Sequence, residues 1–100
     1  MSLSNAEKKS FRAIGHSLKP IVTIAQNGLS DNVKQEIDRA LTDHELIKVK
    51  IQVADRESKQ ELIELMCREL AAESVQTIGH IALIYRAAKK PKQRLSNLKR

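Results

Sequence analysis

The residues best placed to do chemistry lie where a run of β-branched residues meets the start of a helix. Residues 21–33 read IVTIAQNGLSDNV, and the corner at 25–28, Ala-Gln-Asn-Gly, carries no charge. A strand, a glycine turn and a capped helix together direct unpaired backbone N–H groups outward at a helix N-terminus, where the dipole favours an anion. Gly28 permits positive φ and the close approach of a phosphate. The corner therefore predicts anion binding, although a turn without a ligand explains the same residues.

Charge is segregated along the chain. Of the 100 residues, 18 are Lys or Arg and 12 are Asp or Glu, and the formal net charge is +6. Residues 31–73 hold seven basic and eleven acidic residues, whereas the two flanks hold eleven basic residues and only Glu7. Solubility alone gives no reason for this separation, so we expect an anionic partner. Only Phe11 and Tyr85 are aromatic, which leaves almost no platform for stacking bases.

Patterns typical of catalysis or metal binding are weak. His16, His44 and His80 lie far apart in the sequence and form no metal-ligand spacing. Cys67 lies on the apolar side of a predicted helix, which favours a buried, inert thiol over a nucleophile. We therefore expect no enzyme activity, no cofactor and no metal. A single cysteine also excludes an intramolecular disulfide and favours a reducing compartment.

The chain has no segment typical of a membrane protein or a secreted one. No apolar run approaches the roughly 20 residues that a membrane-spanning helix needs. The first residues, MSLSNAEKKSF, lack the apolar stretch of a secretory signal. We therefore expect a cytoplasmic protein that does not bind membranes. The length predicts one domain at 1–87, followed by a basic tail at 88–100.

Three helix starts are marked by capping residues. Ser4, with Glu7 three residues later, makes a capping box for a helix that ends near residue 15. Ser30 precedes a second helix that ends at 42–44. Asp55 precedes a third helix, which carries a broad apolar face.

Four short strands complete the predicted fold. Residues 21–24 are apolar at three of four positions, which predicts an interior strand covered on both faces. In HELIKVKIQV, apolar residues alternate with Lys48 and Lys50, which predicts a half-buried strand with both lysines on one face. Residues 75–78 and 81–86 suit a tight hairpin. The order α-β-α-β-α-β-β predicts a two-layer α/β sandwich with a four-stranded mixed sheet, parallel where helices cross over and antiparallel at the hairpin.

Basic side chains outside the glycine corner extend the predicted anion-binding surface. Lys48 and Lys50 also suit a merely solvated strand face or a protected sheet edge. Together with Arg86 and the tail AAKKPKQRLSNLKR, they instead predict a continuous positive surface. Pro91 interrupts any helix in that tail, and the few apolar residues there do not offset the entropy of ordering it.

The order of these motifs resembles a known family. The segments LKPIVTIAQNGLSDNVKQEIDRAL, HELIKVKI, DRESKQEL and IGHIALIYR lie between about Ser4 and Arg86. They resemble the bacterial YhbY-type members of the CRM-domain family, named for chloroplast RNA splicing and ribosome maturation. The resemblance implies a compact α/β fold similar to the C-terminal domain of translation initiation factor 3. It also implies RNA binding and association with precursors of the large ribosomal subunit.

The glycine corner departs from the pattern of that family. Its members typically carry GxxG after the first strand, a motif likened to the phosphate-clamping loop of KH domains. Here Ala25 replaces the first glycine, and Gln26 or Asn27 stands where a basic residue is often found. Gly28 and the helix start are retained. Backbone amides are therefore still expected to meet a phosphate, whereas the charge must come from lysines elsewhere.

These observations predict a monomeric protein that binds structured ribosomal RNA and assists assembly of the large ribosomal subunit. In this hypothesis the amides at 28–31 seat a phosphate, and recognition depends on the RNA backbone and shape. General nucleic-acid binding, and an adaptor that binds a ribosomal protein, are the alternatives. The predicted RNA-binding residues are Lys8, Lys9, Arg12, Lys19, Gln26, Asn27, Gly28, Leu29, Ser30, Lys48, Lys50, Arg86, Lys89, Lys90, Lys92 and Arg94.

Overall fold

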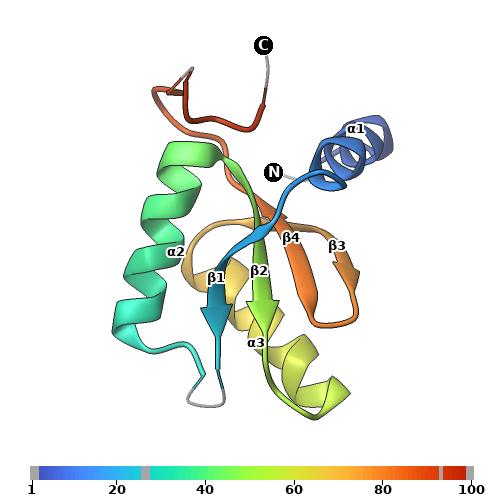
Figure 1. The fold of residues 1–100 in the computed structure, drawn as a ribbon, viewed down its shortest axis with the longest axis vertical. Helices are drawn as coiled ribbons and strands as arrows, with labels where there is room; N and C mark the ends of the chain where they lie inside the picture. Colours follow the sequence, from blue (N-terminus) through green and yellow to red (C-terminus); the bar gives the residue numbers. More distant parts are fainter. Residues whose placement is uncertain (1–2, 26–27, 93, 99–100) are drawn as a thin grey trace.

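The computed structural model describes residues 3–25, 28–92 and 94–98. Among them the predicted α-β-α-β-α-β-β order and the predicted fold class are confirmed, with three helices and a four-stranded mixed sheet (Figure 1). The elements are α1 (Asn5–Gly15), β1 (Pro20–Ile24), α2 (Asp31–His44), β2 (Leu46–Ile51), α3 (Arg56–Glu69), β3 (Glu73–Ile78) and β4 (Ile81–Tyr85).

Each helix begins at the capping residue that the sequence predicts. The hydroxyl of Ser4 accepts a hydrogen bond from the N–H of Glu7 at 3.1 Å, and the Glu7 carboxylate accepts one from the N–H of Ser4 at 3.0 Å. The Ser30 hydroxyl accepts from the N–H of Val33 at 3.2 Å. A carboxylate oxygen of Asp55 accepts from an N–H in the first turn of α3 at 3.0 Å. These bonds pair donors that a helix N-terminus leaves open, so short-range sequence is enough to start each helix.

The strands are ordered β1-β2-β4-β3 across the sheet. β1 and β2 are parallel and joined through α2, whereas β4 is antiparallel to both β2 and β3. Because β4 lies between β2 and β3, the parallel pairing expected across α3 does not form. β1 is an edge strand, and the prediction of an interior strand covered on both faces is wrong: Ile21, for example, is 51% exposed.

Helices α2 and α3 cover one face of the sheet, which we call the helical face (Figure 1). Alternation along β2 directs Ile47, Val49 and Ile51 to this face, where they are buried against side chains from both helices. The same core contains Met66 of α3. This face holds the larger of the two hydrophobic clusters in the described part of the chain.

The opposite face, which we call the open face, is covered at one end only. There α1 packs Phe11 and Ile14 over a smaller cluster that contains Leu46 and Leu83. Gly15 is buried in this contact, and glycine allows the close approach because a β-carbon at that position would stand 2.6 Å from a methyl of Leu83. Beyond α1, the strands of the open face meet solvent.

The C-terminal segment packs against the upper end of α2 in Figure 1. The hydroxyl of Ser96 donates to the buried carboxylate of Glu45 at 3.0 Å, and Leu98 is buried beside Leu46 in the smaller cluster. The expectation that the tail has too few apolar residues to be ordered is therefore wrong for residues 96–98. One leucine is sufficient there because α1 and β2 already supply the rest of the apolar cluster.

Candidate nucleic-acid interface

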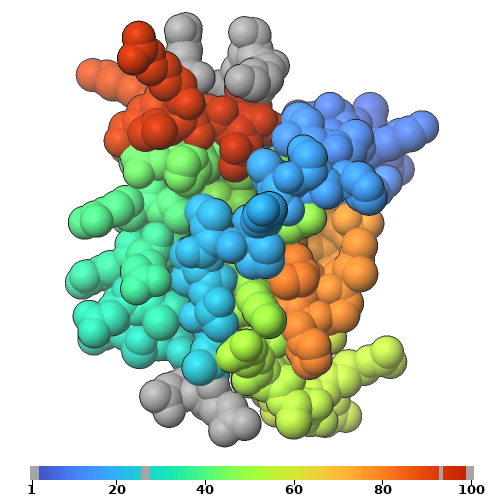
Figure 2. Space-filling model, in the orientation of Figure 1, coloured from blue at the N-terminus to red at the C-terminus, as the bar shows by residue number. Residues whose placement is uncertain are grey.

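The open face presents two rows of side chains that cross the sheet. Neighbouring strands lie about 4.8 Å apart, so each row is a short path from one sheet edge to the other. Figure 2 views this face directly, between α1 in blue and the start of α3 in yellow-green. The registers place Pro20, Lys48, Leu83 and Gln76 in the first row, and Thr23, Lys50, Ile81 and Ile78 in the second.

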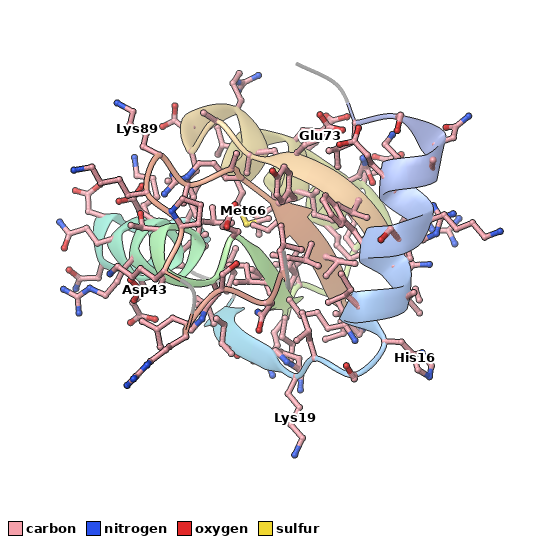
Figure 3. All side chains as sticks on the ribbon, turned by 90° about the horizontal axis from the view of Figure 1, so that it is seen from above. His16, Lys19, Asp43, Met66, Glu73 and Lys89 are labelled. Carbon is pink, nitrogen blue, oxygen red and sulfur yellow. The ribbon has the colours of Figure 1, made fainter. Side chains whose placement is uncertain are left out.

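Basic side chains gather on and beside this face. Lys48 and Lys50 project from β2, and both lie on the face opposite to the larger core, as the alternation predicts. Arg12 is exposed on α1, and Lys19 is exposed just before β1. In Figure 3, Lys19 extends away from the sheet into solvent. Among the described residues, none of these four cations forms an ion pair, so their charge is available to an anion.

One side of α1 carries basic residues, two of which border the open face. Lys8, Arg12 and His16 follow one another at four-residue spacing, which places them on one side of the helix. Arg12 and His16 both line a hollow in the open face. Lys9 is exposed on α1 and lines none of the hollows described here. His16 was not among the predicted binding residues, although its helical spacing from Arg12 was visible in the sequence.

Arg86 does not belong to this surface. Its guanidinium donates to the carboxylate of Asp38 at 2.8 Å, to the Asp38 carbonyl and the Thr42 hydroxyl at 2.9 Å, and to the Leu70 carbonyl at 3.1 Å. These partners belong to α2 and to the end of α3, and only 21% of the Arg86 side chain is exposed. The prediction that Arg86 joins the two lysines of β2 in one positive surface is therefore wrong.

The basic residues of the tail lie far from the glycine corner. Gly28 precedes the first turn of α2, whereas the tail packs at the last turn, where Lys92 pairs with Asp43. The 14 residues of α2 separate the two ends by about 20 Å. Lys89, Lys90 and Arg94 are exposed beside that far end. The structure thus brings together Arg12, Lys19, Lys48 and Lys50 on the open face, whereas the basic residues of the tail lie at the end of α2 that is far from Gly28.

Gly28 has a φ of +79°, in the region that glycine adopts most easily. Its N–H donates to the Ala25 carbonyl at 2.9 Å, and the N–H of Ser30 donates to the Gly28 carbonyl at 3.0 Å. Two of the amides expected to seat a phosphate are thus used by the turn itself. Of the four amides at 28–31 in the hypothesis, those of Leu29 and Asp31 are the ones that form no such turn bond with another described residue.

Nearby charges further limit the glycine corner as an anion site. Asp31 places an exposed carboxylate in the first turn of α2, where it opposes a phosphate. The ammonium of Lys34 lies 3.3 Å from Glu69 and 3.9 Å from Asp31, so its charge is already paired. Gln26 and Asn27 lie outside the described residues. The open face is therefore the stronger positive surface.

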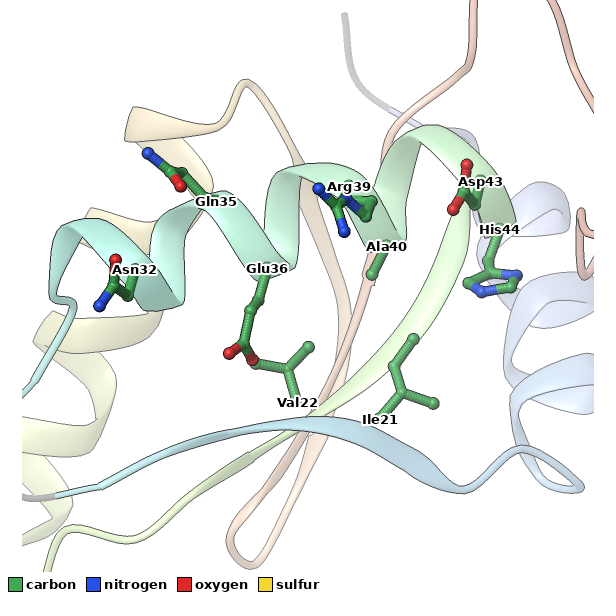
Figure 4. A pocket seen from close by; sticks show the side chains of 9 residues that line it. All are labelled: Ile21, Val22, Asn32, Gln35, Glu36, Arg39, Ala40, Asp43 and His44. Carbon is green, nitrogen blue, oxygen red and sulfur yellow. The ribbon is translucent and has the colours of Figure 1, made fainter.

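A second groove runs between the edge strand β1 and α2 (Figure 4). It measures about 520 Å³ and contains Glu36 and Asp43 as well as Arg39 and His44. The carbonyl of Leu95 lies 2.6 Å from Nδ1 of His44, so this ring nitrogen already has a hydrogen-bond partner in the tail. With charges of both signs, this groove attracts a polyanion less than the open face does.

The chain has a single cysteine, which lies in α3. Cys67 is half-buried, and burial together with the charge of Glu73 raises the pKa of its thiol to about 11. The thiol is therefore protonated at neutral pH, which agrees with the expected inert cysteine. No group of three or more His, Cys, Asp or Glu side chains in the described ranges is arranged to hold a metal. Within the same ranges, every helix is too short or too polar to cross a membrane.

Known proteins resemble this chain over nearly its whole length. Residues 3–86 match the CRS1/YhbY (CRM) domain family. A Pseudomonas aeruginosa protein named a probable RNA-binding protein is 46% identical over 100 residues, covering 100% of this chain and 96% of its own. A Haemophilus influenzae protein named an RNA-binding protein is 46% identical over 94 residues, covering 94% and 95%.

A solved structure agrees with this assignment. The solution structure of a Staphylococcus aureus protein, described as a hypothetical protein and candidate RNA-binding protein, superposes with a TM-score of 0.80 at 34% identity. The match covers 92% of this chain and 96% of that one. Because the family match spans all seven elements, sequence and fold lead to the same conclusion: the chain belongs to the CRS1/YhbY (CRM) domain family.

Proposed function

We propose that this protein binds RNA through the open face of its sheet. The observation that carries the proposal is that Arg12, Lys19, Lys48 and Lys50 lie on one side, and none of them is ion-paired within the described residues. Relatives named as RNA-binding proteins support RNA as the anion. Contacts between such cations and phosphates supply most of the affinity for a polynucleotide.

The RNA is proposed to cross the open face toward the glycine corner. Lys50 partners Thr23, which lies two residues before Ala25 and the turn that follows it. A backbone that contacts Lys48 and then Lys50 therefore continues toward the amides of Leu29 and Asp31. The tail lies off this path, so its exposed lysines contribute less than the lysines of β2.

In its finer form, the proposal concerns ribosome assembly. We infer that the RNA is structured ribosomal RNA in precursors of the large subunit, and that binding assists assembly of that subunit. The family resemblance supports this step. The protein is proposed to act as a monomer in the cytoplasm, without a cofactor and without catalysing a reaction.

Binding in solution tests the electrostatic part of the proposal. Four phosphate contacts predict that log K falls with log salt concentration at a slope of about −3 to −4. A slope near zero would contradict binding through the basic face. Competition between duplex DNA and ribosomal RNA separates RNA binding from general nucleic-acid binding, because only the former requires a preference for the RNA.

Crosslinking in cells tests the ribosomal part. Ultraviolet crosslinking followed by sequencing of the attached RNA is expected to enrich precursor RNA of the large subunit. An even spread over transcripts would contradict a role in subunit assembly but leave RNA binding intact. Association with ribosomal particles that survives removal of accessible RNA by nuclease would instead favour the protein-binding adaptor.

A further inference from the structure

The open face is hollowed beside α1. The hollow measures about 170 Å³ and is enclosed by side chains from α1, β2, β3 and β4. Pockets for drug-sized ligands measure about 300–1,000 Å³, so this one has room for one small planar group or one phosphate. The chemistry of the side chains that line the hollow indicates which of these groups fits.

The floor of the hollow is apolar. Leu83 of β4 is buried beneath α1, and Ile81 beside it is half-buried. Ile78 partners Ile81 from the edge strand β3, and its side chain is 64% exposed. A flat apolar group laid on these side chains would remove much of that exposed surface from water, which is favourable. A phosphate alone would leave the floor in contact with water.

The rim of the hollow is cationic and polar. Arg12 and His16 line the hollow from α1 and its C-terminal end, and Lys48 lines it from β2. Gln76 stands in the same cross-strand row as Leu83 and Lys48, and its amide both donates and accepts hydrogen bonds. The described residues that line the hollow include no Asp or Glu. An apolar floor within a cationic rim matches a nucleotide, whose base is flat and whose phosphate is anionic.

We propose that this hollow receives the base of one unpaired nucleotide of the bound RNA, whose phosphate stays at the rim. The base lies on Ile78 and Ile81, its edge meets Gln76, and the phosphate lies between Arg12 and Lys48. The inference rests on the proposed RNA binding and specifies the kind of RNA that is preferred. A continuous duplex keeps its bases stacked and offers only backbone, so it engages the rim and leaves Ile78 in water.

Aliphatic side chains take the place that aromatic ones hold in many RNA-binding domains. The two aromatic rings, Phe11 and Tyr85, lie with their centroids 4.7 Å apart in the cluster under α1, and neither ring lines the hollow. The face of a base can therefore contact only the isoleucines and the leucine of the floor. Recognition is thus expected to involve one base as well as the backbone and shape.

Two RNA hairpins that differ by a single bulged nucleotide test this proposal. Fluorescence anisotropy with the full chain is expected to show tighter binding to the bulged hairpin. Ile78→Ser is expected to reduce this preference about five-fold, the effect of losing part of one aliphatic contact, while affinity for the unbulged hairpin is unchanged. Ile21→Ser is the matched control, because Ile21 is the exposed isoleucine of the other edge strand and lies outside the hollow.

The possible outcomes are distinguishable. Equal affinity of the unmodified protein for both hairpins, or a preference that survives Ile78→Ser, would overturn the nucleotide pocket and leave the basic face intact. Failure to bind either hairpin at low salt would overturn the proposed function itself. Methyl NMR gives a readout without substitution: the bulged hairpin is expected to shift the methyl signals of Ile81 and Leu83 more than the unbulged one does. Equal shifts with both hairpins would also overturn the pocket.

Discussion

Arg86 Nη1 donates to Asp38 Oδ1 at 2.8 Å, and this contact joins the end of β4 to the middle of α2. The same guanidinium reaches the Leu70 carbonyl at 3.1 Å, at the end of α3. One cation therefore holds two helices and a strand together at the rim of the larger core. Its role in this structure is to stabilise the fold rather than to add charge to the open face.

Replacing Arg86 by alanine is expected to lower the free energy of unfolding by about 1.5–3 kcal/mol, because charge-assisted hydrogen bonds to partly buried acceptors are lost. The RNA affinity of the folded protein is expected to change little. Urea unfolding and RNA titration of the same variant measure the two effects. Arg68→Ala, at an exposed position of α3, is the charge-matched control. A large loss of RNA affinity with unchanged stability would show that Arg86 contributes to RNA binding.

The double variant Lys48→Ala/Lys50→Ala is expected to weaken RNA binding by a similar factor for every sequence. Two phosphate contacts fewer reduce the magnitude of the salt slope by about 1.5. Arg39→Ala/Arg68→Ala removes the same charge from exposed positions of α2 and α3 and is expected to have a smaller effect. A greater loss of RNA affinity in this control would indicate that the RNA binds the helical side of the molecule.

Gly15→Ala is expected to destabilise the protein by about 1–3 kcal/mol, since its new methyl group would stand 2.6 Å from a methyl of the buried Leu83, so that the Leu83 side chain or α1 must shift. Adding Leu83→Ala makes room for that methyl. In a double-mutant cycle, the cost of Gly15→Ala should therefore be smaller in the Leu83→Ala background. Equal costs in both backgrounds would mean that α1 does not press on β4 at this point.

Leu98→Ala tests whether the tail packs as the structure describes. Leu98 is buried with Leu46, so its truncation is expected to cost about 2 kcal/mol of unfolding free energy. Leu95→Ala is the control, because Leu95 is 45% exposed. Thermal or urea unfolding compares the two. If both variants match the unmodified protein, the segment contributes nothing to the core.

The cap of α3 is expected to make stability depend on pH. Hydrogen bonds from the N–H and hydroxyl of Ser58 hold the pKa of Asp55 below its ordinary value of 3.8. The ionised cap therefore stabilises the fold above about pH 4, and this contribution is lost as the pH falls through the lower, folded-state pKa.

Asp55→Ala is thus expected to cost more unfolding free energy at pH 7 than at pH 3 in urea titrations. Ser30→Ala, which removes a cap that does not titrate, should cost the same at both values. An equal cost of Asp55→Ala at the two pH values would show that ionisation of this carboxylate does not stabilise α3.

Much of the fold is readable from short stretches of sequence. Ser4, Ser30 and Asp55 each bond to the helix that follows them, so a helix start depends on residues three positions apart. Lys48 and Lys50 share a face because side chains in a strand alternate. The family resemblance rests on the same local motifs, and the matching of residues 3–86 to the family bears it out.

Other features depend on partners that are distant in the sequence. The apolar residues of β1 suit an interior or an edge strand, and β1 is at the edge because, in the order β1-β2-β4-β3, it pairs with β2 alone. Arg86 finds its carboxylate 48 positions away, and Ser96 finds Glu45 at a separation of 51. The sequence shows that these segments contain cations, but it does not show which of those cations pair with a carboxylate elsewhere in the fold.

The sequence by itself determined the helices, the strands, the family and the presence of strong positive charge, because capping, alternation and composition act over a few residues. Only the tertiary structure determined which of these cations can bind an external anion. It brought Arg12 and Lys48 to one hollow over Ile81, and it tied Arg86 and Lys92 to acids of α2. The physical reason is that a cation binds an external phosphate only where folding has left it without an internal carboxylate, and that pairing is set by the packing of distant segments.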